Sequence, residues 1–172
     1  MQSGIGFDIH RLVAGRPLVL GGVTIPFRKG LKGHSDADCL VHAVCDAILG
    51  AIGDSDMGEH FPDTDPRFKN ISSLNLLKQV RKRAKALGFS LVHLDTLVIA
   101  QEPKLSPFKP AIRRRLAKTL SLAEKRVNVK AKTTEGLWLT GRSQGIASYA
   151  IATVARTRSP KGARIQRKRQ AT

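Results

Sequence analysis

Three side chains in the first quarter of the chain are of types that bind divalent metals: Asp8, His10 and His42. Asp8 and His10 lie in a segment that alternates small or apolar with polar residues, which predicts a β-strand over residues 3–10. Side chains two apart on a strand leave the same face, so both can approach a single ion. The helix expected next carries His42. Two histidines and one carboxylate, with a coordination position left free, are typical of a catalytic zinc.

Two aspartates accompany His42 on the predicted helix. Asp38, His42 and Asp46 follow an i, i+4, i+8 spacing and share one helix face, where the carboxylates can orient the imidazole. The alternative is a surface histidine between two solvated acids, and each residue taken singly favours that alternative. Their combination with the two strand residues favours a metal centre, and such a centre can polarise a phosphoryl oxygen.

His34 and Ser35 lie where this helix is expected to begin. Backbone amides at a helix N-terminus, together with the positive end of the helix dipole, suit a phosphate group. The hydroxyl and the imidazole add further donors. Simple N-capping by Ser35 explains the serine equally well, so a phosphate site and a cap both stay open.

A long polar loop over residues 54–70 contains two prolines and five acids. Loops of this length inside a compact domain are usually functional. Carboxylates such as those of Asp56, Asp63 and Asp65 can hold sugar hydroxyls or a divalent ion. The same Asp-x-Asp-Pro pattern also makes ordinary turns, so each fragment alone is a weak signal.

A polar segment near the C-terminus combines a carboxylate with hydroxyls. Residues 132–135 read Lys-Thr-Thr-Glu and end a predicted strand, and residues 140–142 read Thr-Gly-Arg before a predicted last helix. Glu135 can bind a magnesium ion that bridges phosphates, while Thr133 can hydrogen-bond them. A polar loop with a capped helix is the alternative, and the spacing does not decide between the two.

The hydrophobic pattern divides the chain into alternating strands and helices. It predicts strands at 3–10, 89–101 and 127–133, a hairpin at 17–26 around Gly21-Gly22, and a loop at 28–33. Helices are predicted at 36–53, 72–87, 106–120 and 143–155. Their expected N-terminal signals are Ser35 or Asp36, Ser72 or Ser73, and Pro107. This alternation predicts an α+β or α/β layered domain.

The net charge of +17 invites a nucleic-acid function. Residues 158–172 hold six Lys or Arg and no acid, and we expect a disordered basic tail there. The clusters at 81–83 and 113–115 lie in helical patterns typical of solvated faces. Few aromatic side chains are available to stack on bases. A nucleic-acid-binding module is therefore the less favoured function, and we do not expect a nucleic-acid partner.

Other features of the sequence concern location. No apolar run reaches the roughly 20 residues that span a membrane, so no membrane partner is expected. Because residues able to do chemistry begin as early as Asp8, we expect no targeting leader before the first motif. Cys39 and Cys45 are six apart on one helix and face different ways, so we expect both to be reduced and buried. These features predict a cytoplasmic protein.

Together the motifs closely resemble the 2-C-methyl-D-erythritol 2,4-cyclodiphosphate synthase family. The matching runs span 6–10, 34–38 with His42, 56–66, 132–135 and 140–142, in the family's order between residues 3 and 157. The resemblance implies an α+β fold: one layered domain over residues 1–157, a mixed β-sheet with helices on one face, assembling as a homotrimer with active sites between subunits.

The resemblance also implies a reaction. The family converts 4-diphosphocytidyl-2-C-methyl-D-erythritol 2-phosphate to the cyclic diphosphate and CMP, in the non-mevalonate route to isoprenoids. The 2-phosphate attacks the β-phosphorus within the same molecule. Two other functions stay open beside it: a metal-dependent phosphohydrolase, which would release free phosphate, and a basic nucleic-acid-binding module, whose affinity would fall steeply with salt.

Residue roles carry over by position. The resemblance implies zinc at Asp8, His10 and His42, a second divalent ion (magnesium or manganese) at Glu135, and catalytic roles for His34, Thr133 and Glu135. The implied substrate contacts are Asp8, His10, His34, Ser35, Asp56, Gly58, Phe61, Asp63 and Asp65; a cytidine-binding segment of the adjacent subunit, Ala100, Gln101, Glu102, Pro103, Lys104, Leu105 and Ser106; and Lys132, Thr133, Thr134, Glu135, Leu139 and Arg142. Three positions, Lys132, Leu139 and Gln144, depart from the residue that many relatives carry.

Overall fold

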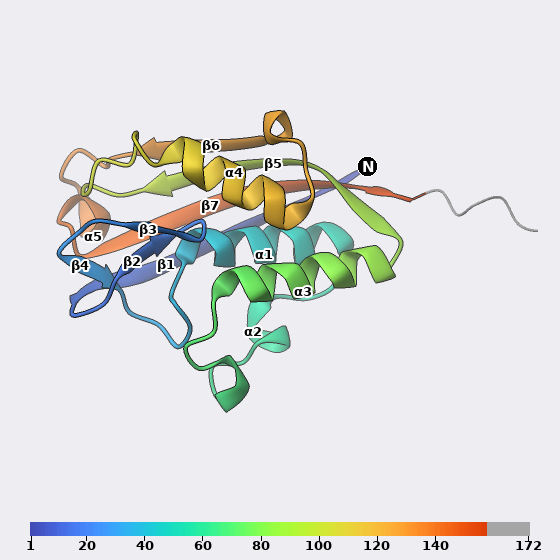
Figure 1. The fold of residues 1–172 in the computed structure, drawn as a ribbon, viewed down its shortest axis with the longest axis horizontal. Helices are drawn as coiled ribbons and strands as arrows, with labels where there is room; N and C mark the ends of the chain where they lie inside the picture. The colour runs from blue at the N-terminus through green and yellow to red at the C-terminus, as the bar shows by residue number, and fades with distance from the viewer. Residues whose placement is uncertain (158–172) are drawn as a thin grey trace, which may run out of the picture.

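The computed structural model describes residues 1–157, and the predicted basic tail at 158–172 lies outside the described residues. The chain forms a five-stranded sheet covered by helices, with a separate two-stranded hairpin (Figure 1). In chain order the elements are β1 (Gln2–Ala14), β2 (Leu18–Leu20), β3 (Val23–Ile25), β4 (Lys29–Leu31), α1 (Cys39–Ile52), α2 (Met57–His60), the 3₁₀ turn η1 (Pro66–Phe68), α3 (Ser73–Ala86), β5 (Phe89–Ile99), α4 (Lys109–Leu120), the 3₁₀ turn η2 (Glu124–Arg126), β6 (Val127–Lys132), α5 (Trp138–Gly141) and β7 (Gly145–Arg156).

The large sheet has the strand order β4-β1-β7-β5-β6. Only the β5–β6 pair is parallel among the strand pairs of the described chain, so the sheet is mixed, as predicted. Helices α1, α3 and α4 all lie on the same side of this sheet (Figure 1). The other face is left with exposed apolar side chains: Ile5, Phe7, Ile9, Tyr149 and Ile151. The predicted α+β class with helices on one face is confirmed.

Helix α1 lies directly against β1 because two glycines in the strand remove the side chains between them. A Cβ atom on Gly6 would stand 2.0 Å from the carbonyl oxygen of Ala43, and one on Gly4 would stand 2.3 Å from that of Ala47. The helix supplies much of the core, with Leu40, Val44 and Ile48 fully buried. This close approach carries the first turn of α1 to the part of β1 that holds the predicted metal ligands.

The predicted helix at 143–155 is wrong, because this segment is strand β7. From Ser148 to Val154 its residues alternate between buried and less buried positions, the period of a strand. The segment is rich in alanine and apolar on both faces, which hides that alternation in the sequence. β7 pairs with β1 on one side and β5 on the other, and these long-range hydrogen bonds decide its structure.

Several element boundaries also differ from prediction. Helix α1 begins at Cys39 with Asp38 as its N-cap, because Ala37 has a φ of 58° and cannot continue a helix backwards. Helix α4 begins at Lys109, with Pro110 rather than Pro107 in its first turn. The expected loop at 28–33 contains β4, and the loop at 54–70 contains α2 and η1.

The hairpin around Gly21-Gly22, the helix after Ser72 and the strands at 89–101 and 127–133 are confirmed within two residues. Cys39 and Cys45 are both buried and unpaired with each other, as predicted. Among residues 1–157, no helix is both long and apolar enough to cross a membrane.

Candidate active site

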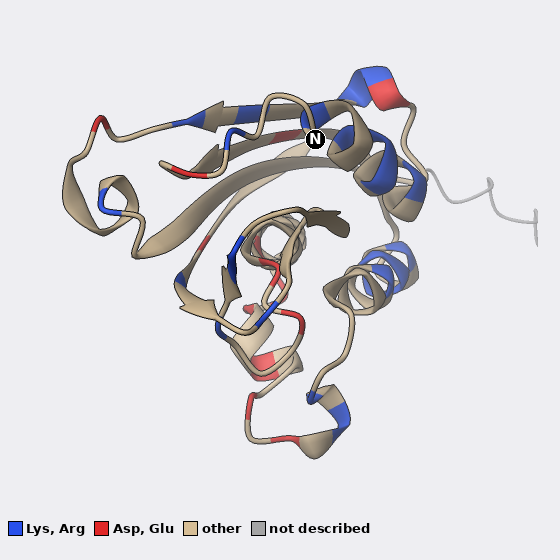
Figure 2. Ribbon diagram, turned by 60° about the vertical axis from the view of Figure 1, so that its left-hand side comes forward, with Lys and Arg blue, Asp and Glu red and all other residues tan. Residues whose placement is uncertain are grey.

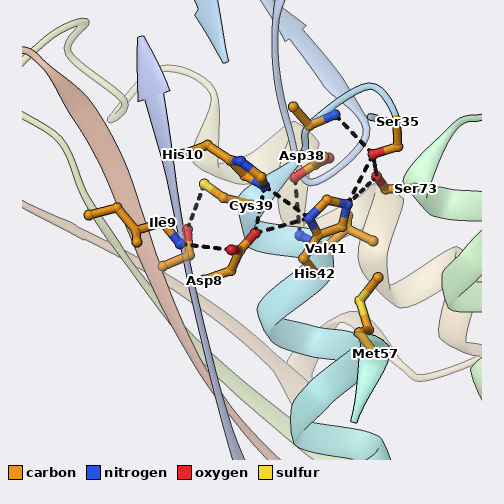
Figure 3. A network of polar contacts seen from close by, with 12 residues as sticks. Asp8, Ile9, His10, Ser35, Asp38, Cys39, Val41, His42, Met57 and Ser73 are labelled. Atoms are coloured by element: carbon orange, nitrogen blue, oxygen red, sulfur yellow. Dashed lines mark hydrogen bonds and ion pairs between the residues drawn. The ribbon is translucent and has the colours of Figure 1, made fainter. Parts of the chain in front are cut away.

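The three predicted metal ligands meet where β1 faces the first turn of α1 (Figure 3). One carboxylate oxygen of Asp8, Oδ2, lies 2.9 Å from His10 Nε2 and 2.9 Å from His42 Nδ1. The two ring nitrogens lie 3.2 Å apart. The strand period brings Asp8 and His10 to one face, and the Gly6 contact brings His42 down to meet them.

These donor atoms fit a zinc ion. Ligand atoms at about 2.0–2.1 Å around a tetrahedral zinc stand roughly 3.3 Å from one another, close to the spacings found here. Lone pairs that point at each other over such distances repel unless a cation or a proton lies between them. Two imidazoles and one carboxylate are also the donor types of catalytic zinc sites.

The electrostatics of the three groups reflect this mutual approach. Burial by itself raises the pKa of the Asp8 carboxyl, but hydrogen bonds and charge from His10 and His42 outweigh it and hold that pKa well below its ordinary value. Burial lowers the pKa of His42, but the hydrogen bond and charge of Asp8 outweigh it and raise that pKa. The site therefore favours a negative carboxylate with positive charge at its partners, which a bound cation also provides.

The second nitrogen of His42 is held by hydroxyl groups that the sequence analysis did not single out for this role. His42 Nε2 lies 2.9 Å from Ser73 Oγ and 3.2 Å from Ser35 Oγ (Figure 3). Ser73 donates in turn to a carboxylate oxygen of Asp36, and the other oxygen of Asp36 accepts from the Ser73 backbone N–H at 3.0 Å. Asp36 thus caps α3 from a distant loop. The only local signal was the serine pair at the start of a predicted helix.

The predicted support of His42 by Asp38 and Asp46 is wrong. Asp38 is fully buried, and its carboxylate accepts from the backbone N–H groups of Gly21, Gly22 and Val41 at 2.6–3.1 Å. Burial raises the pKa of Asp38 to about 6, although the N–H donors of Gly22, Gly21 and Val41 lower it. Asp46 accepts from the N–H of Met57 at 2.8 Å. Both carboxylates are held by the backbone, so they fix loops rather than the imidazole.

The metal ligands lie in the wall of a cavity of about 540 Å³ between β1, α1 and the loop at 54–70. Predicted residues that line it are Asp8, His10, His34, Ser35, His42, Gly58, Phe61 and Asp63. Phe7, Gly33, Asp46, Met57, Pro62, Phe68 and Leu76 complete the lining. A cavity of this size, lined by both apolar and polar residues, suits a small molecule.

His34 and Ser35 do not lie at a helix N-terminus, since α1 begins four residues after Ser35. They belong to a loop that other segments hold in place. Arg16 donates to the carbonyl oxygens of Gly33 at 2.9 Å and Ser35 at 2.7 Å, and the Asn70 N–H donates to that of His34 at 2.9 Å. Gly33, His34 and Ser35 of this loop line the cavity, and the helix N-terminus lies further along the chain.

Two predicted aspartates of the following loop act as caps. Asp56 accepts from the N–H of Glu59 at 3.0 Å at the start of α2. Asp65 accepts from the N–H of Arg67 at 2.9 Å at the start of η1, and its carboxylate also pairs with the Arg67 side chain. Neither side chain lines the cavity within this chain, whereas Gly58 and Asp63 between them do.

The predicted residues of the segments at 100–106 and 132–135 form a second group outside the metal-site cavity. The N–H of Ala100 donates to the carbonyl oxygen of Lys132 at 3.0 Å, which joins the segments at 100–106 and 132–135. Thr133 Oγ1 donates to the Glu135 carboxylate at 2.7 Å. Neither segment lines the metal-site cavity. Leu139 and Arg142 line a different hollow, of about 710 Å³, which His10 also reaches.

Comparisons with known proteins agree with these features. The model of the YgbB family matches residues 1–155. The chain is 55% identical over 152 residues to the 2-C-methyl-D-erythritol 2,4-cyclodiphosphate synthase of Desulfatibacillum aliphaticivorans, which covers 88% of this chain and 98% of that protein.

Solved structures share the fold. A CDP-bound 2C-methyl-D-erythritol-2,4-cyclodiphosphate synthase aligns with a TM-score of 0.83 and 35% identity, over 90% of this chain and 100% of that one. The bifunctional IspDF from Campylobacter jejuni aligns with a TM-score of 0.87 and 48% identity, over 90% of this chain but only 42% of that longer one. By sequence and by fold the chain belongs to the YgbB family, whose curated relatives are named 2-C-methyl-D-erythritol 2,4-cyclodiphosphate synthase, and the resemblance of its motifs is confirmed.

Proposed function

We propose that this chain converts 4-diphosphocytidyl-2-C-methyl-D-erythritol 2-phosphate to 2-C-methyl-D-erythritol 2,4-cyclodiphosphate and CMP. It would thus act as a phosphorus–oxygen lyase of isoprenoid biosynthesis. The observation that carries the proposal is the convergence of Asp8, His10 and His42 in the wall of a cavity that is also lined by His34, Ser35 and Asp63. Relatives that are 52–56% identical bear the name of this enzyme.

The proposed reaction needs no nucleophile from the protein. The 2-phosphate of the substrate attacks the β-phosphorus of the same molecule, so the protein must hold two anionic groups together and in line. His34 and Ser35 would donate to the methylerythritol phosphate part, and Asp63 would accept from its hydroxyls. A zinc ion at Asp8, His10 and His42 would offset the repulsion between phosphates by polarising a phosphoryl oxygen.

We further propose a second divalent ion, magnesium or manganese, at Glu135, with Thr133 beside it. The Glu135 carboxylate is exposed and lies within hydrogen-bond distance of Thr133. Carboxylate and hydroxyl oxygens are the donors that such hard cations prefer. The cytidine part would contact residues 100–106, which the 3.0 Å hydrogen bond from Ala100 to Lys132 holds beside this group.

A cytoplasmic location of this enzyme stays a prediction.

We also propose a homotrimer with each active site formed between two subunits. The separation of the metal cavity from residues 100–106 and 132–135 within one chain supports this arrangement. So does the apolar outer face of the sheet, where Ile5 is 68% exposed and Ile151 is 47% exposed. Contiguous apolar surface of this kind usually lies in an interface. Sedimentation equilibrium tests it, and a monomer at active concentrations would contradict it.

The reaction is tested by mixing the purified protein with its proposed substrate and following phosphorus NMR, with and without a chelator. Cyclic diphosphate and CMP should appear only while metal is present. Free phosphate as the product would favour a metal-dependent hydrolase that uses water instead. No turnover with added zinc and magnesium would refute both.

A further inference from the structure

Positive charge is concentrated on two neighbouring helices of the fold. Helix α3 contains five Lys or Arg residues and no acid, and α4 likewise contains five and no acid. Figure 2 shows these residues on both helices, while many of the acids lie on the loop at 54–65 around α2. The excess charge of the sequence is thus unevenly spread over the surface.

The side chains of six cations form what we term the basic face. They are Lys78, Arg81, Lys82 and Lys85 of α3, with Arg114 and Lys118 of α4. On α3, the spacing of Lys78, Lys82 and Lys85 is i, i+4, i+7, which places them on the side opposite the buried Leu76 and Leu77. On α4, Arg114 and Lys118 are likewise four apart and both exposed.

The two rows of charge lie side by side. Arg81 donates from its guanidinium to the carbonyl oxygen of Thr119 at 3.0 Å, which joins α3 to the C-terminal end of α4. The chain therefore presents one surface with charges from both helices, and no sequence pattern predicts this because the helices are separated by strand β5.

The cations of the basic face are not neutralised by the described chain. Within residues 1–157, the ion pairs of lysine and arginine are Arg28–Glu102, Arg67–Asp65, Arg83–Asp54, Arg113–Glu124 and Lys130–Asp95. None of these uses a residue of the basic face. Like charges four apart on a helix destabilise it, and most surfaces intersperse the two signs. Such a surface suits a polyanion.

In contrast to the expectation from the sequence that the chain has no nucleic-acid partner, we infer that the basic face binds the phosphate backbone of double-stranded nucleic acid without preference for sequence. Arginine and lysine side chains in rows match the regular charge of a backbone. The face has no aromatic side chain for stacking on unpaired bases, which disfavours single strands. The large exposed apolar side chains lie mainly on β1, β7 and α5, apart from Leu87 at the end of α3. The basic face therefore has few apolar side chains that could insert into a membrane. This property is separate from the proposed reaction.

The test measures fluorescence anisotropy of a labelled DNA duplex of about 20 base pairs between roughly 50 and 200 mM salt. All variants are full-length and carry serine at the six basic positions of the tail: Arg158, Lys161, Arg164, Arg167, Lys168 and Arg169. One variant removes three charges of the basic face, with Lys78→Gln, Lys82→Gln and Lys118→Gln. A matched control removes three exposed charges elsewhere, with Arg11→Gln, Lys32→Gln and Lys69→Gln.

We expect the first variant to lose at least about tenfold in duplex affinity near 100 mM salt. The slope of log affinity against log salt concentration should fall in magnitude by about three. The control should change much less. Thermal melting, together with turnover of 4-diphosphocytidyl-2-C-methyl-D-erythritol 2-phosphate, checks that each variant is folded. Lys85→Gln with Arg114→Gln repeats the test at different positions in case the first variant is unstable.

Three results would overturn the inference. Equal losses in the two three-charge variants would mean that net charge alone attracts the duplex. A single strand of the same length that binds as tightly would exclude duplex recognition. Stronger binding to phosphatidylserine vesicles than to the duplex would assign the surface to a membrane.

Discussion

Ser73 Oγ lies 2.9 Å from Nε2 of His42, and it connects the metal ligand on α1 to the first residue of α3. Ser73 donates its own proton to Asp36, so its oxygen accepts from the imidazole. Nε2 of His42 then carries the hydrogen, and the lone pair of Nδ1 faces Asp8 and His10. A polar contact from a separate helix thereby selects the tautomer that can bind a metal.

Replacing Ser73 with alanine should weaken zinc binding by about 10–100-fold, because the imidazole loses the acceptor that sets its tautomer and orientation. Competition with a chelating dye measures the affinity without using the reaction. Ser72→Ala is the matched control, since Ser72 is exposed and its side chain makes no cap hydrogen bond. Equal zinc affinities of the two variants would contradict this role of Ser73.

His42→Ala should lose both zinc and activity, because it removes one of three ligands and leaves the Asp8 carboxylate with only His10. Metal analysis of the purified protein and the phosphorus NMR assay measure the two effects. His93→Ala on β5 removes a histidine outside this site and should keep both. Full activity of His42→Ala would refute the ligand assignment.

Glu135→Gln should keep zinc and lose much of its response to magnesium or manganese. The amide retains the shape of the side chain but not the charge that a divalent ion needs. Rates measured against metal concentration, at constant zinc content, reveal the change. If the dependence on magnesium is the same as in the unchanged chain, Glu135 does not hold the second ion.

Arg16→Ala should reduce kcat/KM by roughly tenfold or more while the fold persists. The guanidinium donates to the carbonyl oxygens of Gly33 and Ser35, on both sides of His34, and its loss frees the loop that faces the substrate cavity. Arg16→Lys should recover only part of the rate, since an ammonium lacks the planar fork. A complete recovery by lysine would show that charge, not geometry, matters at this position.

Asp38→Ala should destabilise the chain by roughly 3–5 kcal/mol, because the backbone N–H groups of Gly21, Gly22 and Val41 lose their acceptor in a buried place. Urea unfolding, followed by circular dichroism, gives the free energy of unfolding. Asp63→Ala, at an exposed loop position, should change it by about 0.5 kcal/mol or less. A similar small effect at Asp38 would mean that its three contacts add nothing to stability.

Local pattern predicted the parts of the site that depend on local geometry. Asp8 and His10 share a face because strands have a period of two, and the Gly21-Gly22 pair marks the hairpin. The same reasoning failed at β7, where an alanine-rich segment apolar on both faces reads as a helix. Its conformation depends on pairing with β1 and β5, and those strands are distant in the chain.

The sequence by itself therefore determined the residue types that can bind a metal and a phosphate, and the family to which the chain belongs. Only the tertiary structure decided which side chains support them. It replaced Asp38 and Asp46 with Ser73 as the group that holds His42, with Asp36 holding Ser73 in turn, and it separated Glu135 from the metal cavity within one chain. The physical reason is that helix and strand periods set only the direction in which a side chain leaves its own element. The partner it meets depends on how distant elements pack, and that packing is a property of the whole chain.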